Sequence, residues 1–225
     1  MFFDLDDTLL ATSWSRPIRA ELATARIIRD HPHVDAEDLI RRILFVAPGT
    51  TWAVGAEAAL KELGLQNTEA GREASRIWFF DGPGSTELLV TVEGAMDAIA
   101  NLRPELRLGI ITNGSETFQR FKYETLDLKD RIAVFLTSDR AGCHKPDVLI
   151  FQMALREADV EPHEAVFIGD SYDADIVGAL GAGMHAVWYN PARHQLETDL
   201  ETRHHELHSY ADLAALLATL DVIEP

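Results

Sequence analysis

Short apolar runs alternate with segments of helical periodicity over the second half of the chain. Runs typical of buried strands occupy residues 106–112, 133–137, 165–169 and 185–189. Strands that alternate with helices in this way predict βαβ units and a parallel sheet. Residues 1–5 are a further short apolar strand, and its brevity leaves open that the native start lies upstream.

The helices predicted between and after these strands share apolar positions at i, i+3 and i+4. They cover residues 92–102, 116–126, 146–158, 173–182 and 210–220. The sequence therefore predicts an α/β fold whose core is a parallel sheet flanked by helices.

Residues 12–87 interrupt this alternation with a pattern that is helical almost throughout. Helices are expected at 16–29, from 35 onward, at 51–63 and at 68–80. Asp81-Gly-Pro-Gly-Ser85 then breaks the pattern. We expect a core domain of residues 1–11 and 88–225 with an inserted helical domain at 12–87, and hinges near 11–13 and 81–85.

Composition narrows the classes of partner. The 225 residues carry a formal net charge of −17, which argues against nucleic acid and anionic membranes as partners. Any anionic substrate must then meet local positive charge. The single cysteine, Cys143, excludes an intrachain disulfide and suits a reducing compartment, and no leader or bilayer-length apolar run is evident. We expect a cytoplasmic protein, monomeric or homodimeric.

The first strand runs into three carboxylates, Asp4, Asp6 and Asp7. Two unit charges about 4 Å apart repel by roughly 4 kcal/mol at an effective dielectric of about 20. A divalent cation together with a phosphoryl substrate would offset that repulsion. A solvated acidic turn is the simpler interpretation of these residues alone.

Three later segments place polar groups where other predicted strands end or helices begin. Ile110-Ile111 leads into Thr112-Asn113-Gly114, and Phe167-Ile168-Gly169 leads into Asp170 and Asp175. Lys145 precedes Pro146, which we expect at the first position of a helix. The carboxyl edge of a parallel sheet is where ligands bind, so these segments are expected to converge. Carboxylate oxygens suit Mg²⁺, and hydroxyl, amide and ammonium groups suit a phosphoryl group.

These residues resemble the motifs of the haloacid dehalogenase (HAD) superfamily, subfamily I, in its nucleotidase/phosphatase-like branch. The motifs are DxDx[TV], a Ser/Thr after an apolar strand, a Lys-Pro pair and GDxxxxD. They are matched in order by Asp4, Asp6, Thr8, Thr112, Lys145, Pro146, Gly169, Asp170 and Asp175. The resemblance implies a Rossmann-like core, and the insert resembles the family's helical C1 cap in position and helical character.

The resemblance implies roles for the acids at the first strand. Asp4 would be the nucleophile that forms an aspartyl-phosphate, and Asp6 would protonate the leaving oxygen and then activate water. Like charge near Asp6 would raise its pKa, which general acid work needs. The Asp4 carboxylate, the Asp6 carbonyl and Asp170 would hold Mg²⁺. Asp7 matches no catalytic position, and a surface or helix-capping role is expected.

The remaining motif residues would bind the phosphoryl group. Thr112 and the amides of Asn113 and Gly114 would contact its oxygens, and Lys145 would neutralise its charge. Asp175 would orient Lys145 or lie in the outer shell of the metal. The resemblance implies a small phosphorylated metabolite as substrate and a phosphatase as the activity. A phosphomutase, a 2-haloacid dehalogenase and a non-catalytic binding protein are the alternatives, and Asp6 disfavours the dehalogenase.

Substrate choice has weaker signals. Residues 112–122 match TNGxxxxQxxK, a pattern of a branch that includes pyrimidine 5′-nucleotidases and sugar-phosphate phosphatases, so a nucleoside 5′-monophosphate is the first guess. Substrate contacts are sought in the insert. The candidates are Trp14, Arg16, Arg19, Trp52, Trp78 and Phe79, with both arginines expected at the surface. His204, His205 and His208 are expected in a solvated loop.

Overall fold

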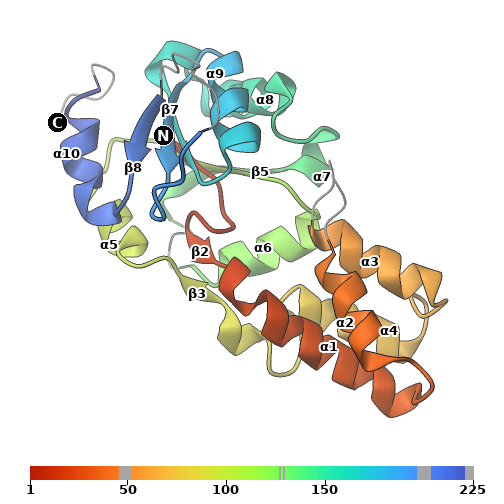
Figure 1. Ribbon diagram of the computed structural model, residues 1–225. Helices are drawn as coiled ribbons and strands as arrows, with labels where there is room; N and C mark the ends of the chain where they lie inside the picture. The colour runs from red at the N-terminus through yellow and green to blue at the C-terminus, as the bar shows by residue number, and fades with distance from the viewer. Residues whose placement is uncertain (46–51, 127, 129, 197–203, 221–225) are drawn as a thin grey trace. The chain divides into compact units, whose positions relative to one another are not determined.

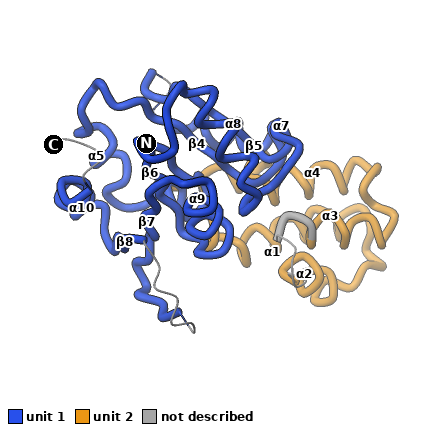
Figure 2. Tube along the Cα trace, turned by 90° about the horizontal axis from the view of Figure 1, so that it is seen from above, with its two compact units in different colours: residues 1–11, 91–225 blue, residues 12–90 orange. Residues whose placement is uncertain are grey.

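The computed structural model describes residues 1–45, 52–126, 128, 130–196 and 204–220. It divides into two compact units, which Figure 2 colours separately. Unit 1 comprises Met1–Ala11 and Thr91–Pro225, and unit 2 comprises Thr12–Val90. The second boundary falls after the predicted position, so the turn at 81–85 lies inside unit 2. There Ser85 Oγ donates to the Gly82 carbonyl at 2.9 Å and closes that turn.

Unit 1 is built on a six-stranded sheet in which every strand pair is parallel. Its order is β5-β4-β1-β6-β7-β8, and Figure 1 shows the strands running through the centre of this unit. The strands are β1 Phe2–Phe3, β4 Leu108–Thr112, β5 Ile132–Thr137, β6 Val166–Gly169, β7 His185–Tyr189 and β8 His204–Leu207. The predicted α/β class with a parallel sheet is confirmed. The strand order reverses on either side of β1, which makes the ends of β1 and β6 a topological switch point.

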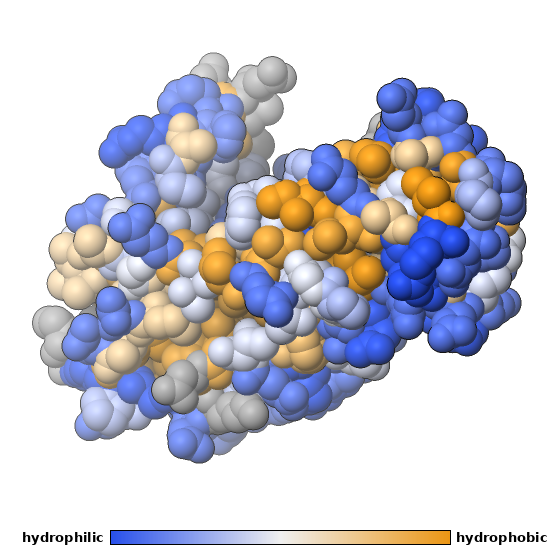
Figure 3. Space-filling model, turned by 90° about the horizontal axis from the view of Figure 1, so that it is seen from below, coloured by the Kyte–Doolittle hydropathy of each residue, from blue (hydrophilic) through white to orange (hydrophobic). Residues whose placement is uncertain are grey.

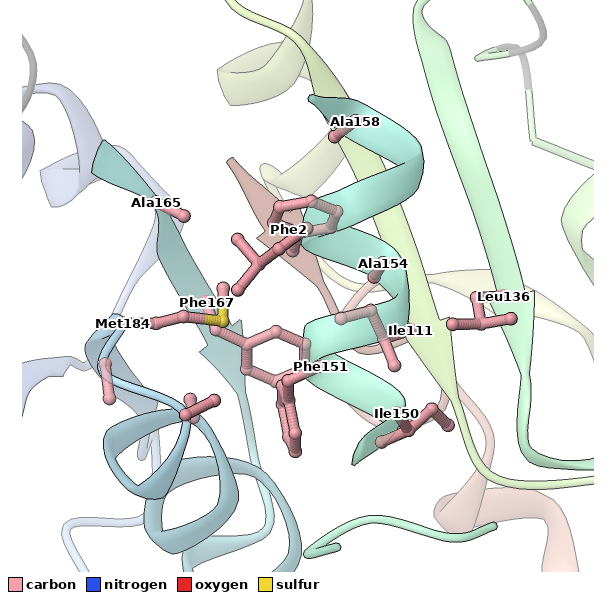
Figure 4. Packing of buried hydrophobic residues seen from close by; sticks show 14 of the residues in the cluster. Phe2, Ile111, Leu136, Ile150, Phe151, Ala154, Ala158, Ala165, Phe167 and Met184 are labelled. Atoms are coloured by element: carbon pink, nitrogen blue, oxygen red, sulfur yellow. The ribbon is translucent and has the colours of Figure 1, made fainter. Parts of the chain in front are cut away.

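One face of the sheet carries a continuous apolar core, shown in Figure 4. Side chains alternate along each strand, so Phe2, Ile111 and Phe167 reach this face. Helices α8 (Val148–Ala158) and α9 (Gly178–Gly181) cover it. Gly109 makes room in this layer, because a Cβ there would lie 2.5 Å from the Phe2 ring. Cys143 packs at the edge of the same cluster.

The opposite face is covered by α5 (Ala95–Ala100), α6 (Glu116–Glu124) and α10 (Leu213–Leu217). Tyr123 of α6 stacks on Phe135 with ring centroids 4.8 Å apart. Tyr210, just before α10, packs on Tyr189 with centroids 5.0 Å apart. The Tyr210 hydroxyl also donates to the Thr8 carbonyl at 3.0 Å, which ties the loop after β1 to a residue near the chain's end.

Several local predictions were wrong. Helix α8 begins at Val148 because the Asp147 side chain accepts from Leu149 N at 2.9 Å, so Pro146 is not its first residue, and the Lys145–Pro146 peptide is cis. The helix predicted at 173–182 is present, as π-helical turns at Tyr172–Val177 followed by α9. His204 and His205 lie in strand β8 rather than in a loop, because this strand pairs with β7. Helix α7 (Ser138–Ala141) and the short pair β2 (Leu10–Ala11) and β3 (Val90–Thr91) were not predicted.

Unit 2 is helical, as the insert pattern predicts. Its helices are α1 Arg16–Asp30, α2 Ala36–Leu44, α3 Trp52–Glu62 and α4 Glu69–Trp78. Asp35 caps α2 by accepting from Asp38 N at 2.9 Å, and Thr68 caps α4 by accepting from Gly71 N at 3.0 Å. Gly64, with φ 68°, follows α3 where a left-handed residue is needed.

Arg19 corrects the expectation of a surface charge, since it is 0% exposed. Its guanidinium donates to the carbonyls of Thr12, at 2.8 Å, and Trp78, and lies 3.9 Å from the centroid of the Phe80 ring. Aromatic faces and carbonyls are favourable surroundings for a guanidinium. Arg19 therefore links the first residue of unit 2 to the end of α4.

The candidate substrate contacts of the insert fall into different environments. Trp14 is 50% exposed, whereas Trp78 and Phe79 are buried and Arg16 is half-buried. The side chain of Trp52 lies outside the described residues. Figure 3 shows that apolar residues interrupt the polar surface on the face it presents. Among the described helices, none is both long and apolar enough to cross a membrane.

Candidate active site

The predicted site residues of unit 1 lie at the carboxyl edge of three neighbouring strands. Asp4 follows β1, Thr112 ends β4 and Asp170 follows β6, in the strand order β4-β1-β6. Asp4 N donates to the Ile168 carbonyl at 2.9 Å, which continues the pairing of β1 with β6 up to the acidic turn. Parallel pairing thus brings together groups that are more than 100 positions apart in the sequence.

Lys145 bridges two of the carboxylates. Its Nζ donates to Asp4 Oδ1 at 2.7 Å and to Asp175 Oδ1 at 2.6 Å, and the Lys145 side chain is 2% exposed. Asp175 Oδ2 accepts from Ser171 N at 3.0 Å. A Cβ at Gly169 would lie 2.3 Å from Asp175 Oδ2, so only glycine leaves space for this carboxylate. Asp175 thus contacts both the Lys145 ammonium and the Ser171 amide.

Burial and crowding shift the acid–base behaviour of the cluster. Burial raises the pKa of Asp4 to about 7, although Lys145 opposes the shift. Burial, with the like charges of Asp4 and Asp175, raises the pKa of Asp170 to about 8. Burial alone would lower the pKa of Lys145, but the carboxylates of Asp175 and Asp4 outweigh it and raise that pKa. The site therefore holds more acid than its one bridging ammonium balances.

These carboxylates fit a divalent cation. Asp4, Asp170 and Asp175 each place a carboxylate oxygen within 4.8 Å of the others. Thr8 Oγ1 donates to Asp170 Oδ1 at 3.2 Å, and Trp188 Nε1 donates to the Asp170 carbonyl at 2.8 Å. Hard carboxylate oxygens that lie close together, shielded from most of the solvent, are the ligands that Mg²⁺ prefers.

Asp6 has neighbours that the sequence analysis did not assign to it. Lys122 Nζ donates to both carboxylate oxygens of Asp6, at 2.6 Å each. Gln119 Nε2 donates to Asp6 Oδ2 at 2.9 Å. Both residues lie on α6, and their i, i+3 spacing puts them on one face of that helix. The QxxK spacing within the TNGxxxxQxxK pattern was the available signal, but it was interpreted as a sign of substrate class.

The loop after β4 holds the other predicted phosphate contacts. Asn113 Nδ2 donates to the Lys145 carbonyl at 3.1 Å, and Lys145 N donates to Asn113 Oδ1 at 2.9 Å, so this side chain fastens two loops together. Gly114, with φ 142°, donates its N–H to Ser138 Oγ at 2.9 Å. The Gly114 amide predicted to bind phosphoryl oxygens is thus held by Ser138 in this structure.

Asp7 lies in the turn that follows β1 and the first two acids. It has φ 55°, and its N–H donates to the Leu10 carbonyl at 2.6 Å in the turn after β1. The predicted helix-capping role is wrong, because the turn leads into β2 rather than into a helix. Its charge nevertheless contributes to the raised pKa of Asp170, after burial, Asp4 and Asp175.

Comparison with known proteins settles the family. A family model described as haloacid dehalogenase-like hydrolase matches residues 1–183. The chain belongs to this family. The HAD resemblance drawn from the motifs is therefore confirmed.

Three relatives of this HAD-like hydrolase carry phosphatase or nucleotidase names. It is 31% identical to a glyceraldehyde 3-phosphate phosphatase of Pyrococcus furiosus, over 98% of this chain and 92% of the relative. It is 26% identical to the N-acylneuraminate-9-phosphatase of Mus musculus, over 98% and 94%. The pyrimidine 5′-nucleotidase YjjG of Escherichia coli matches at 31% over 46% and 47%. The predicted enzyme class, a HAD-type phosphomonoester hydrolase, agrees with these names.

A solved structure supports the fold of this HAD-like hydrolase. A HAD phosphatase from Thermococcus onnurineus has a TM-score of 0.75 at 23% identity, with 99% of this chain and 98% of that chain covered. At that identity the likeness establishes the shared fold.

Proposed function

We propose that the protein is a Mg²⁺-dependent phosphatase that hydrolyses a small phosphomonoester through an aspartyl-phosphate on Asp4. The observation that carries this proposal is the buried Lys145 bridge between Asp4 and Asp175, with Asp170 beside it at the switch point of the sheet. A phosphoryl dianion can approach a carboxylate only where cations offset the repulsion. Such a site stabilises the charge of phosphoryl transfer mainly by positioning and electrostatics.

Each residue has a defined part in the proposed reaction. Asp4 attacks phosphorus, the bond to the leaving oxygen breaks, and Asp6 supplies the proton to that oxygen. Water then attacks the phosphorus of the aspartyl-phosphate, Asp6 takes the proton, and orthophosphate leaves as the Asp4 carboxylate is restored. Thr112, which is 1% exposed, and Lys145 would hold the phosphoryl oxygens throughout.

The Asp4 carboxylate, the Asp6 carbonyl and Asp170 are the proposed Mg²⁺ ligands. Asp175 is already engaged by Lys145 and by Ser171 N, which suits an outer position. When bound, Mg²⁺ would supply positive charge between the carboxylates and the phosphoryl oxygens.

The substrate is proposed only as a small phosphorylated metabolite. Relatives matched over almost the whole chain are named for a triose phosphate and a sugar phosphate, and YjjG for pyrimidine nucleotides. A nucleoside 5′-monophosphate remains a first guess. Its motif support is weaker than the sequence suggested, because Gln119 and Lys122 contact Asp6. We propose that unit 2 is the specificity cap, with Trp14 as the most exposed of the candidate contacts whose side chains the structure describes.

The proposal is tested with p-nitrophenyl phosphate and a panel of phosphorylated metabolites. Hydrolysis should require Mg²⁺, stop with EDTA and return when Mg²⁺ is added in excess. Acid quench during turnover with ³²P-labelled substrate should leave label on the protein, and hydroxylamine should release it. Hydrolysis that persists in EDTA, or unlabelled protein in the quench, would refute the metal dependence or the covalent intermediate respectively. Release of halide from a 2-haloacid would instead favour the dehalogenase alternative.

A further inference from the structure

Lys122 occupies an unusual position for a lysine on a surface helix. Its side chain is 2% exposed, whereas Arg120 on the same helix is 44% exposed and pairs with Glu116. Burying an ammonium is unfavourable unless an anion and hydrogen bonds compensate it. Asp6, whose side chain is 18% exposed, provides the anion. The pair spans 116 positions of sequence and joins α6 to the loop after β1.

The contacts fix the orientation of the Asp6 carboxylate. The outer torsion of an aspartate is broad when nothing holds it. Lys122 Nζ lies 2.6 Å from each Asp6 oxygen, and Gln119 Nε2 lies 2.9 Å from Oδ2. Lysine and the amide nitrogen of glutamine only donate, so both Asp6 oxygens accept in this arrangement. The two side chains of α6 thereby select one rotation of the carboxylate.

Gln119 also connects Asp6 to the proposed binding site of the phosphoryl group. Its Nε2 lies 2.5 Å from Thr112 Oγ1 and 3.1 Å from the Asn113 carbonyl. The position of Asp6 is therefore set relative to Thr112, the hydroxyl proposed to hold the phosphoryl group. Gly114 keeps this space open, because a Cβ there would lie 3.0 Å from Gln119 Cγ.

We propose that Lys122, assisted by Gln119, is a positioning residue that aims the Asp6 carboxylate at the water that hydrolyses the aspartyl-phosphate. The inference rests on the proposed function. In that step the water oxygen bonds to phosphorus, the bond from phosphorus to Asp4 breaks, and the water proton passes to Asp6. Geometry is critical there, because a misplacement of about 1 Å can cost about 100-fold in rate.

The decisive variant is Lys122→Met, studied with p-nitrophenyl phosphate in stopped flow. Nitrophenolate leaves without needing a proton, so formation of the aspartyl-phosphate should not depend on Asp6. A misoriented Asp6 carboxylate should therefore slow hydrolysis of the intermediate more than its formation. We expect kcat to fall by about 10- to 100-fold, and KM to fall with it so that kcat/KM changes by less than about 3-fold. A burst approaching one nitrophenolate per enzyme should precede the slow steady state.

Arg120→Met is the matched control, since it removes a cation from an exposed position of the same helix. It should keep wild-type kcat and show no new burst. A folded Lys122→Met enzyme with wild-type kcat, or with kcat and kcat/KM reduced equally and no burst, would overturn the positioning role. Melting temperatures establish that each variant is folded.

If Lys122→Met fails to fold, Gln119→Met decides the question, because it keeps the ion pair and removes one donor to Asp6. A burst with reduced kcat supports the inference, and wild-type kinetics refute it. The underlying phosphatase proposal is judged separately. An inactive wild-type enzyme would refute that proposal, whereas an active wild type with unaffected Lys122 and Gln119 variants would refute only the positioning role.

Discussion

Both units bury a cation, but they surround it differently. In unit 1, Lys145 contacts Asp4 and Asp175, which lie 141 and 30 positions away in the sequence. In unit 2, Arg19 donates to the carbonyls of Thr12 and Trp78 and lies against the Phe80 ring. The carboxylates around Lys145 outnumber its single positive charge, so a further cation would be stabilised there. Carbonyls and rings around Arg19 instead complete a packed interior.

The surroundings of Lys145 are those of a ligand-binding site, whereas the surroundings of Arg19 are those of a structural interior. The raised pKa values of Asp4 and Asp170 show that their charged forms are unfavourable in this cluster. A bound cation would stabilise those charged forms, which is typical of a functional site. A guanidinium among carbonyls and rings is already satisfied. Substitutions at the first kind of cation should therefore change activity, and substitutions at the second should change stability.

The largest effect is expected from Asp4→Asn, which removes the proposed nucleophile. Turnover should fall by more than about 1,000-fold while the fold persists, because catalysis is lost and one buried acid disappears. Steady-state assays and circular dichroism measure the two properties. Retention of a tenth of wild-type activity would exclude Asp4 as the nucleophile.

A somewhat smaller loss is expected from Lys145→Met. Removing one preorganised charge that acts on the transferred group should lower kcat by about 100- to 1,000-fold. Loss of the bridge also leaves Asp4 and Asp175 facing each other, so added Mg²⁺ should raise the melting temperature more than in wild type. An enzyme within a few-fold of wild-type kcat would show that Lys145 has only a structural role.

Arg19→Met should invert the pattern. The carbonyls of Thr12 and Trp78 would lose a buried donor, which costs on the order of 1–3 kcal/mol each in the free energy of unfolding. Urea unfolding should show this loss, and kcat toward p-nitrophenyl phosphate should stay near wild type at temperatures where the protein is folded. A large drop in kcat with unchanged stability would contradict the comparison.

The smallest effect is a dependence of stability on pH in the chelated protein. The pKa values of Asp4 and Asp170 are raised to about 7 and about 8, so the native state holds protons that the unfolded state releases at lower pH. Their contribution is complete below the ordinary aspartate pKa of 3.8 and is lost as pH rises to the raised values, so stability should fall between about pH 4 and pH 8. Melting curves in EDTA should show a shallower fall for Asp170→Asn. An identical slope would remove Asp170 from the cluster's titration.

The sequence pattern predicted helices and strands well where neighbouring residues alone determine the element. The strand at 185–189 matches β7, and the helix start at Asp35 is a capping interaction between neighbours. The pattern failed where contacts between residues far apart in the sequence determine the element. Strand β8 is polar and pairs only because β7 lies beside it. The start of α8 depended on Asp147 as the cap rather than on Pro146.

The candidate site shows the same division between what the sequence could predict and what it could not. The motif residues Asp4, Thr112 and Asp170 lie together because parallel strands align their ends, and Lys145 reaches Asp4 from the segment between α7 and α8. The Lys122–Asp6 pair could not be derived from spacing, since no local rule relates a lysine on α6 to an acid 116 residues earlier. Arg19 was misassigned because charge at a helix surface position is ordinarily solvated.

Strand β1 has a consequence for how the protein comes into being. It lies between β4 and β6, and the loop after it is held by Tyr210. On the ribosome the strand with the proposed nucleophile is therefore made long before either neighbour. Its Asp4 can take its place only after residues 166–169 have emerged, and its loop is fastened later still, when Tyr210 follows. A nascent chain that lacks residues 166–210 would thus carry Asp4 and Asp6 without the strand and the tyrosine that hold them in place.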